Sequence, residues 1–321
     1  MLRKIKKAIA TPEMIIPHLL AKKEAIIHIA SEKRFGEALA YAPTTIGIDT
    51  YTPYMRLKSS EGLIKREIQG FEMYLDPLDK GISQDLLVWG IREELPVKSF
   101  KTELKILSEE VNGKVTVIDI GTNIGYFLLI EATTLGDTAD IYTIEPDEEN
   151  RCIALKNIEM NDFEIEVQQG AIGPKSETVE LYVSVNTNTH RVNNPPIEVN
   201  YEEILEVPQW TLDEFIDTNG IKSADVNVLR MDIEGYETEV FKRMGTVLDN
   251  AGPLVIFFEL HSKTLSNHQL EQVISRLKEH EFQIVSAFHD PPLLPGKKLD
   301  DLDYEDIYTL SHDIQLIVKK Y

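Results

Sequence analysis

Two glycines in a short turn mark a candidate ligand-binding loop. Residues 117–127 read VIDIGTNIGYF, in which an apolar, β-branched run ends near Asp119 and the turn holds Gly121 and Gly125. Glycines let a backbone approach a ligand closely, and the helix pattern that follows offers unpaired N–H groups. A pyrophosphate-binding Gly-x-Gly-x-x-Gly loop would have its middle glycine where Asn123 stands and its last glycine where Tyr126 stands. The loop therefore suits a nucleoside with an amino-acid tail better than a dinucleotide.

Two further positions complete this candidate nucleoside site. Glu145 ends the next strand pattern, where a carboxylate can accept hydrogen bonds from both hydroxyls of a ribose. Ala171 follows the third strand pattern in a small apolar turn that suits an adenine. The alternatives are a surface glutamate beside Asp147 and an ordinary Gly-Ala turn.

Acidic residues and a histidine follow the fourth and fifth strand patterns. Asp232 and Glu234 leave one strand in the same direction, and Glu259 and His261 share a face at the end of the other. Together they could abstract a proton from a hydroxyl or bind a divalent metal, whose presence we leave open. The alternatives are an acidic helix cap and a solvated loop histidine.

Alternating strand and helix patterns position these residues and predict an α/β fold with a mostly parallel sheet. The strand patterns cover 115–119, 140–145, 164–168, 225–231, 254–260, 282–287 and 313–319, and the helix patterns cover 124–135, 147–159, 211–217, 235–245 and 267–280. The connection before the last strand has no helix pattern, which permits an antiparallel pair.

A β-hairpin insertion interrupts this alternation. Two β-like runs, 178–183 and 197–207, flank the polar loop 186–194, which we expect to lie over the site. His190 and Arg191 in this loop could meet an acidic or sugar substrate, or be solvated as most loop residues are.

Three regions follow along the chain: a helical extension over 1–60, a lead-in segment over 61–105, and the main domain over 106–321. In the first, Pro12 and Pro17 each predict the start of a helix. In the second, an extended stretch over 67–76 and a helix over 83–92 would lie across the entrance of the main domain. The basic N-terminus could touch an anionic membrane surface, or pack on the main domain or a second subunit.

Composition limits the class of protein. The net charge of −21 is uneven, because residues 1–105 hold 17 Lys and Arg against 14 Asp and Glu, while the remainder holds 16 against 40. A main domain with this much negative charge would repel the phosphate backbone of DNA or RNA. No apolar run is long enough to span a bilayer or form a secretory signal, and the lone Cys152 excludes an intramolecular disulfide. These features favour a cytoplasmic protein.

The ordered motifs resemble the FkbM-type family of S-adenosylmethionine-dependent methyltransferases. The resemblance covers roughly residues 70–265 and rests on VIDIGTNIGY at 117–126, IEP at 144–146, VPQWTLD at 207–213 and LRMDIEGYE at 229–237. It implies a class I methyltransferase, Rossmann-like sheet of seven strands with the last antiparallel. Arg230 is a departure, since the family usually has lysine there, but it keeps the charge.

The resemblance also implies roles for individual residues. Asp119, Gly121, Asn123 and Gly125 would hold the methionine part of S-adenosylmethionine, Glu145 the ribose, and Ala171 would lie near the adenine. Asp232 would lie beside the sulfonium and the acceptor. The implied activity is O-methylation of a hydroxyl on a sugar, glycan or small natural-product-like molecule. As the base that takes the hydroxyl proton we expect His261 or Asp232, with Glu259 beside them.

Two other classes of function remain. One is a nicotinamide-dependent oxidoreductase on a Rossmann-like sheet, against which the missing glycine at Asn123 and the helix-free final connection argue. The other is a non-catalytic scaffold that keeps the fold and assembles a partner, or a homo-oligomer, through its N-terminal helices. The intact acidic positions argue against that scaffold.

Overall fold

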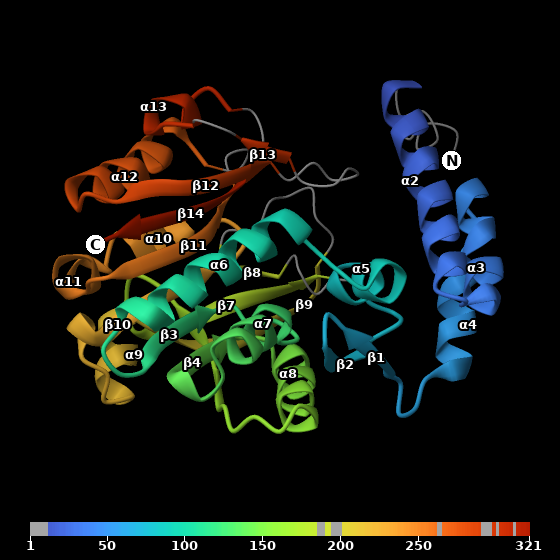
Figure 1. The fold of residues 1–321 in the computed structure, drawn as a ribbon, viewed down its shortest axis with the longest axis horizontal. Coiled ribbons are helices and arrows are strands. Elements are labelled where there is room, and N and C mark those ends of the chain that lie inside the picture. The colour runs from blue at the N-terminus through green and yellow to red at the C-terminus, as the bar shows by residue number, and fades with distance from the viewer. Residues whose placement is uncertain are drawn as a thin grey trace.

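A mixed eight-stranded sheet forms the centre of the protein (Figure 1). The computed structural model describes residues 12–184, 190–193, 201–261, 265–289, 297–299, 302–310 and 313–321. The strands lie in the order β13 (Lys297–Leu299), β12 (Gln283–His289), β14 (Ile314–Lys320), β11 (Leu254–Leu260), β10 (Val226–Met231), β3 (Val115–Ile120), β4 (Ala139–Glu145) and β5 (Val167–Gln169).

Strand directions confirm the expected class I methyltransferase arrangement. β11, β10, β3, β4 and β5 run parallel, whereas β14 pairs antiparallel with both β11 and β12. The three-residue edge strand β13 adds an eighth strand to the predicted seven. The connection before β14 holds this strand and a short helix, α13 (Tyr304–Ile307), so it is not helix-free as predicted.

Helices cover both faces of the sheet because its central strands are apolar on both sides. All six residues of β3 and of β10 are buried. Val115 and Val117 face a core shared with helices α6 and α7, whereas Ile118 and Ile120 face a core shared with α9 to α12. The helices are α6 (Glu94–Glu110), α7 (Tyr126–Leu135), α8 (Glu148–Met160), α9 (Leu212–Thr218), α10 (Glu237–Phe241), α11 (Gly245–Asn250) and α12 (Asn267–Glu279).

A second, four-stranded sheet confirms the predicted hairpin insertion. Its order is β6 (Ala171–Ile172), β9 (Tyr201–Trp210), β7 (Glu177–Ser184) and β8 (Arg191–Val192), with β7 and β9 antiparallel. Of the predicted loop 186–194, only 190–193 fall within the described residues.

The lead-in segment differs from the sequence prediction in two ways. The stretch 67–76 is not one extended run, because β1 (Ile64–Ile68) and β2 (Phe71–Leu75) form a hairpin whose turn residues Gln69 and Gly70 have φ angles of 51° and 96°. Such left-handed pairs match the twist of a two-residue hairpin turn. Helix α6, which was not predicted, crosses the boundary placed at residue 105, whereas α5 (Ile82–Trp89) lies where a helix was expected.

The N-terminal helices pack beside α5 and the β1–β2 hairpin (Figure 1). They are α2 (Pro12–Ser31), α3 (Phe35–Tyr41) and α4 (Tyr51–Lys58). Pro17 does not open a new helix, because α2 runs through it; a proline removes one N–H donor, and residues such as Ala25 and Ile29 still anchor the helix in the core. The basic N-terminus, residues 1–11, lies outside the described residues.

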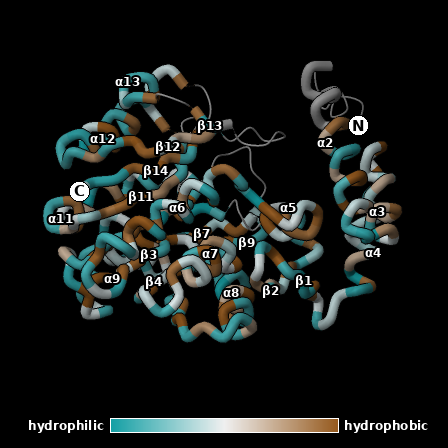
Figure 2. Tube along the Cα trace, viewed as in Figure 1, coloured by the Kyte–Doolittle hydropathy of each residue, from teal (hydrophilic) through white to brown (hydrophobic). Residues whose placement is uncertain are grey.

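Apolar residues gather on the central sheet and on the helices against it (Figure 2). In the N-terminal helices, Phe35, Leu39 and Leu57 remain exposed. Within the described part of the chain, no helix is both long and apolar enough to cross a membrane.

Candidate active site

A cleft of about 820 Å³, counted to its open mouth, lies at the carboxyl ends of β3, β4 and β10. This is where ligands bind in open parallel sheets. Of the residues predicted to hold a cofactor, five line the cleft: Gly121, Asn123, Glu145, Ala171 and Asp232. Residues distant in sequence, including Ile82, Arg92 and His190, complete its walls. The structure therefore brings most of the predicted cofactor residues together.

Gly121 is required by the close approach of two loops. Its φ angle is 77°, and a Cβ atom there would lie 2.7 Å from the carbonyl oxygen of Asp232 and 2.9 Å from the side chain of Ile233. Its N–H donates to the carbonyl of Ile144 at 2.9 Å. Any larger residue would thus displace the loop after β10, which carries Asp232 into the cleft.

Glu145 ends β4 with its carboxylate fixed by backbone donors. One oxygen accepts from the N–H of Asn123 at 2.8 Å, and the other accepts from the N–H of Asp147 at 3.0 Å. The side chain is buried, and this burial raises the pKa of Glu145 to about 8, although the two N–H donors favour the ionised form. Since a carboxylate has about four lone-pair sites, about two remain for ligand hydroxyls.

Two predicted cofactor residues lie off the cleft wall. Asp119 is fully enclosed, and one of its oxygens accepts from Arg230 at 3.2 Å. Gly125, with a φ of 86°, caps α7 and lies against Ala154 of α8, 3.5 Å from where its Cβ would be. Asp119 therefore holds Arg230, and Gly125 allows α8 to pack closely.

Arg230 joins the ends of β3 and β10, a role that its charge alone did not reveal. Nη1 donates to Asp119 at 3.2 Å and to the carbonyl of Gly121 at 3.1 Å, while Nη2 donates to Asp232 at 3.1 Å. Its guanidinium carbon lies 4.3 Å from the centroid of the Phe127 ring. The planar fork of arginine reaches all three oxygens at once, which a lysine ammonium could not do in this geometry.

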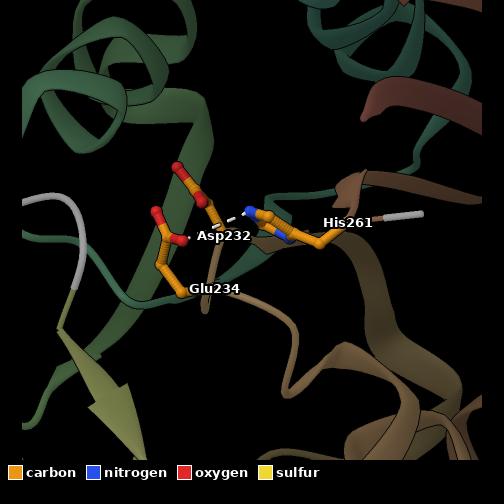
Figure 3. A group of neighbouring side chains, drawn as sticks. All are labelled: Asp232, Glu234 and His261. Carbon is orange, nitrogen blue, oxygen red and sulfur yellow. Dashed lines mark ion pairs between the residues drawn. The ribbon is translucent and has the colours of Figure 1, made fainter. Parts of the chain in front are cut away.

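The three predicted catalytic residues lie at one end of the cleft, but only Asp232 lines it. His261 is buried at the end of β11, with its Nε2 atom 3.5 Å from Glu234 and 3.6 Å from Glu259 (Figure 3). Its Nδ1 atom lies 3.3 Å from Glu237, a fully buried residue of α10.

This surrounding charge bears on whether His261 can act as a base. Burial alone would lower the pKa of His261, but Glu237, Glu259 and Glu234 together raise it to about 11. The ring therefore carries a proton at neutral pH and cannot take one from a substrate in this state.

Glu234 occupies a special backbone position in the turn between β10 and α10. Its φ angle is 55°, which is uncommon outside glycine, and Gly235 follows at 94°. Burial raises the pKa of Glu234 to about 7. Its carboxylate lines the cleft and lies 3.5 Å from Arg191 of the insertion, so it connects the two sheets.

The lead-in segment and the insertion cover the cleft. The hydroxyl of Tyr126 on α7 donates to the carbonyl of Arg92 at 2.9 Å and accepts from Gln69 at 2.6 Å, which fixes the lead-in over the site. His190 accepts a hydrogen bond at Nδ1 from the N–H of Ser184 at 3.0 Å, and burial lowers its pKa. Its neutral ring therefore carries the hydrogen on Nε2.

Sequence reasoning assigned no role to two buried acids. Glu237 stands within the LRMDIEGYE motif, whose dense acidic content was a signal, and its Oε1 accepts from the N–H groups of Ile233 and Gly235. Glu131 is fully buried on α7, where burial raises its pKa well above the usual value. A lone acid in the apolar run YFLLIEA was the only sign of it.

Comparison with known proteins agrees with this geometry. A family model described as the methyltransferase FkbM domain matches residues 119–284, just over half of the chain. A curated relative, the hexuronic acid methyltransferase AglP of Haloferax volcanii, is 22% identical over 204 residues, which cover 60% of this chain and 78% of that protein.

Solved structures with a related fold share little sequence with it. A putative S-adenosylmethionine-dependent methyltransferase from Streptococcus mutans has a TM-score of 0.44 and 9% identity, covering 82% of this chain and 56% of that one. TYW2 of M. jannaschii, in complex with AdoMet, has a TM-score of 0.39 and 11% identity, covering 82% and 89%. The family match, extending from the Asp119 loop through the cleft to β12, shows that this chain is a methyltransferase of the FkbM family.

Proposed function

We propose that this protein transfers a methyl group from S-adenosylmethionine to a hydroxyl of a sugar, in a glycan or a small natural-product-like molecule. The observation that carries the proposal is Glu145. Its buried carboxylate is held by two backbone N–H groups at the sheet edge and still has capacity for two hydroxyl donors. A ribose presents such a pair of hydroxyls.

The cleft residues suit the rest of the same donor. Gly121 and Asn123 present backbone at the end of β3, and Ala171 and Ile172 form a small apolar wall that fits an adenine. Asp232, held by Arg230, offers a negative charge on the opposite wall, where a sulfonium would be stabilised. Asp119 and Gly125 support this site from behind.

The chemistry follows from these positions. The bound donor supplies a methyl group on a sulfonium sulfur, which keeps the electron pair of the broken S–C bond as the acceptor oxygen forms the new C–O bond. The protein must hold the acceptor oxygen in line with that methyl group and exclude water, which the lead-in and the insertion over the cleft would do. We assign the hydroxyl proton to Asp232, because His261 already holds a proton and Glu259 does not line the cleft.

Two observations support a sugar acceptor. Leu181, His190 and Val192 of the insertion line the cleft beside the carboxylates, so the acceptor would meet both apolar and hydrogen-bonding groups. The curated relative is named for a hexuronic acid. A neutral His190 with its hydrogen on Nε2 is a donor suited to a sugar oxygen.

The test is methyl transfer from S-adenosylmethionine labelled with ¹³C in the methyl group to matched glycosides of glucose and glucuronic acid. Transfer to a hydroxyl gives an ether that survives mild base, whereas transfer to a carboxylate gives an ester that base removes. We expect base-stable label, with turnover lost in Asp232→Asn while that variant still binds S-adenosylhomocysteine. Label that base removes completely would contradict the O-methyl ether, and full turnover by Asp232→Asn would contradict its role as base.

A further inference from the structure

We propose that Asp232, Glu234 and His261 bind one divalent cation at the inner wall of the cleft. One ligand atom from each residue lies within 4.8 Å of the others (Figure 3). Oxygen and nitrogen atoms bound to one ion at about 2.1–2.2 Å lie roughly 3–4.4 Å apart. Small side-chain shifts would therefore close this set around an ion.

Two carboxylate oxygens lie near Nε2 of His261 at a spacing that suits ligands of one ion. Nε2 of His261 lies 3.5 Å from an oxygen of Glu234 and 3.6 Å from an oxygen of Glu259. Both distances exceed the usual 2.7–3.2 Å of an N–H···O bond. One ring edge thus faces an oxygen of Glu234 and an oxygen of Glu259 across gaps that an ion could bridge.

A second and independent feature lies behind the ring. Glu237 is fully buried, its Oε1 atom lies 3.3 Å from Nδ1 of His261, and the same oxygen accepts from the N–H groups of Ile233 and Gly235. A carboxylate beside the far nitrogen of a histidine is the usual outer partner of a metal-binding imidazole. Its Oε2 atom is buried with no hydrogen-bond partner among the described residues, so negative charge behind the ring is only partly compensated.

The donor set indicates the class of cation. One imidazole nitrogen with two or three carboxylate oxygens is a mixed set, which suits Mn²⁺, Fe²⁺ or Zn²⁺ better than the all-oxygen sites of Ca²⁺ and Mg²⁺. Four carboxylates surround the single imidazole here: Asp232, Glu234, Glu237 and Glu259. A bound dication would partly neutralise these carboxylates; without the ion, the extra proton on the His261 ring does so.

The role of this cation in the reaction rests on the proposed O-methyl transfer. Because Asp232 and Glu234 line the cleft, an ion bound between them could also coordinate the acceptor hydroxyl. Coordination stabilises the alkoxide, so the hydroxyl proton could leave to Asp232 or water as the C–O bond forms.

Binding is tested without any activity, by following the electron paramagnetic resonance signal of free Mn²⁺ as it is added to metal-stripped protein. We expect one Mn²⁺ per chain, with nitrogen coupling in the pulsed spectrum that disappears in His261→Gln. Glu234→Gln should weaken binding at least tenfold. The matched control is Glu239→Gln, which removes the same charge from α10, where Glu239 pairs only with the nearby Lys242 among the described contacts.

Each result has a separate meaning. No Mn²⁺ binding at millimolar concentration, in protein that still binds S-adenosylhomocysteine, would overturn the metal site and leave the proposed function standing. Equal Mn²⁺ affinity in Glu234→Gln and Glu239→Gln would also overturn it. Specific Mn²⁺ binding without S-adenosylhomocysteine binding would support the metal site and count against the proposed function instead. An unchanged urea unfolding midpoint in each variant shows that it is folded, whether or not it binds S-adenosylhomocysteine.

Discussion

Replacing Arg230 by methionine should destabilise the protein more than any exposed arginine would. Methionine keeps much of the side-chain volume but removes three hydrogen bonds, to Asp119, to the carbonyl of Gly121 and to Asp232. It leaves Asp119 fully enclosed without its cation. Breaking a buried pair in this way costs about 3–5 kcal/mol.

Arg230→Lys separates the charge from the geometry. An ammonium can keep the ion pair with Asp119 but loses about two of the three donated bonds, each with a net contribution of about 0.5–1.5 kcal/mol. Since lysine can shift toward Asp119, we expect a loss of about 1–3 kcal/mol, intermediate between the parent and Arg230→Met. Urea unfolding measures both losses as changes in midpoint at constant slope.

A surface arginine provides the control. Arg151 forms a partly exposed i,i+3 pair with Glu148 and donates to the carbonyl of Val167 at 3.0 Å. Because its loss leaves no enclosed charge without a partner, Arg151→Met should cost only about 1–2 kcal/mol. Burial already raises the pKa of Asp119 in the parent, and loss of Arg230 would raise this pKa further. Both folded proteins lose stability as Asp119 ionises, but the loss continues to higher pH in Arg230→Met, so its deficit should grow as pH rises toward neutrality. Equal unfolding midpoints for Arg230→Met and Arg151→Met would refute the stabilising role of Arg230 between β3 and β10.

Three further predictions concern the cleft and its support. Gly121→Ala should lower affinity for S-adenosylhomocysteine at least tenfold in calorimetry, because its Cβ would lie 2.7 Å from the carbonyl oxygen of Asp232; unchanged affinity would show that the loops can separate freely. Burial raises the pKa of Glu145 to about 8 in the free protein, and hydrogen bonds from ribose hydroxyls favour its ionised form. Binding of S-adenosylhomocysteine should therefore release protons, and its affinity should rise between about pH 6 and 8. Calorimetry in buffers of different ionisation enthalpy measures the protons released, and a release of none would contradict the prediction. Asn157→Ala should lower the free energy of unfolding in urea by about 2–3 kcal/mol. Its buried side chain accepts a hydrogen bond from the N–H of Tyr74 and donates one to the carbonyl of Ile124. A loss below about 0.5 kcal/mol would mean that water replaces these hydrogen bonds.

Local sequence patterns were enough to predict the sheet and which residues meet at the carboxyl ends of β3 and β4. The apolar run that ends near Asp119 and the acid that ends β4 both appear at their expected strand ends. Parallel strands bring such ends together whatever the loops between them do. The position of Glu145 was therefore predictable from spacing alone.

Contacts between distant segments could not be predicted in the same way. The resemblance implied that Asp119 holds the ligand, and the structure shows it enclosed and accepting a hydrogen bond from Arg230, a contact that the sequence did not indicate. The pairing of His261 with Glu237 depends on the turn at Glu234, where a left-handed backbone brings α10 against β11. No local sequence pattern predicts that α10 packs against β11 in this way.

The prediction for the lead-in segment was wrong for a different reason. An isolated Gln69-Gly70 pair is a weak turn signal, so the β1–β2 hairpin was read as one extended stretch. Asn157 of α8 accepts a hydrogen bond from the N–H of Tyr74, and Asn161, which follows α8, donates to the carbonyl of Glu72; both bonds hold this hairpin against the main domain. Its structure is therefore set by tertiary contacts more than by propensity.

The most direct test of the account is a calorimetric titration of the purified protein with S-adenosylhomocysteine, repeated with Glu145→Ala and with Glu148→Ala. Glu148 is a matched control, because its carboxylate lies on the surface of α8 and pairs with Arg151. Two lost hydrogen bonds to a carboxylate, at about 1.5–3 kcal/mol each, predict an affinity loss of at least about 100-fold for Glu145→Ala and none for Glu148→Ala. Absence of binding by the parent protein, or equal binding by all three, would contradict a donor site anchored at Glu145.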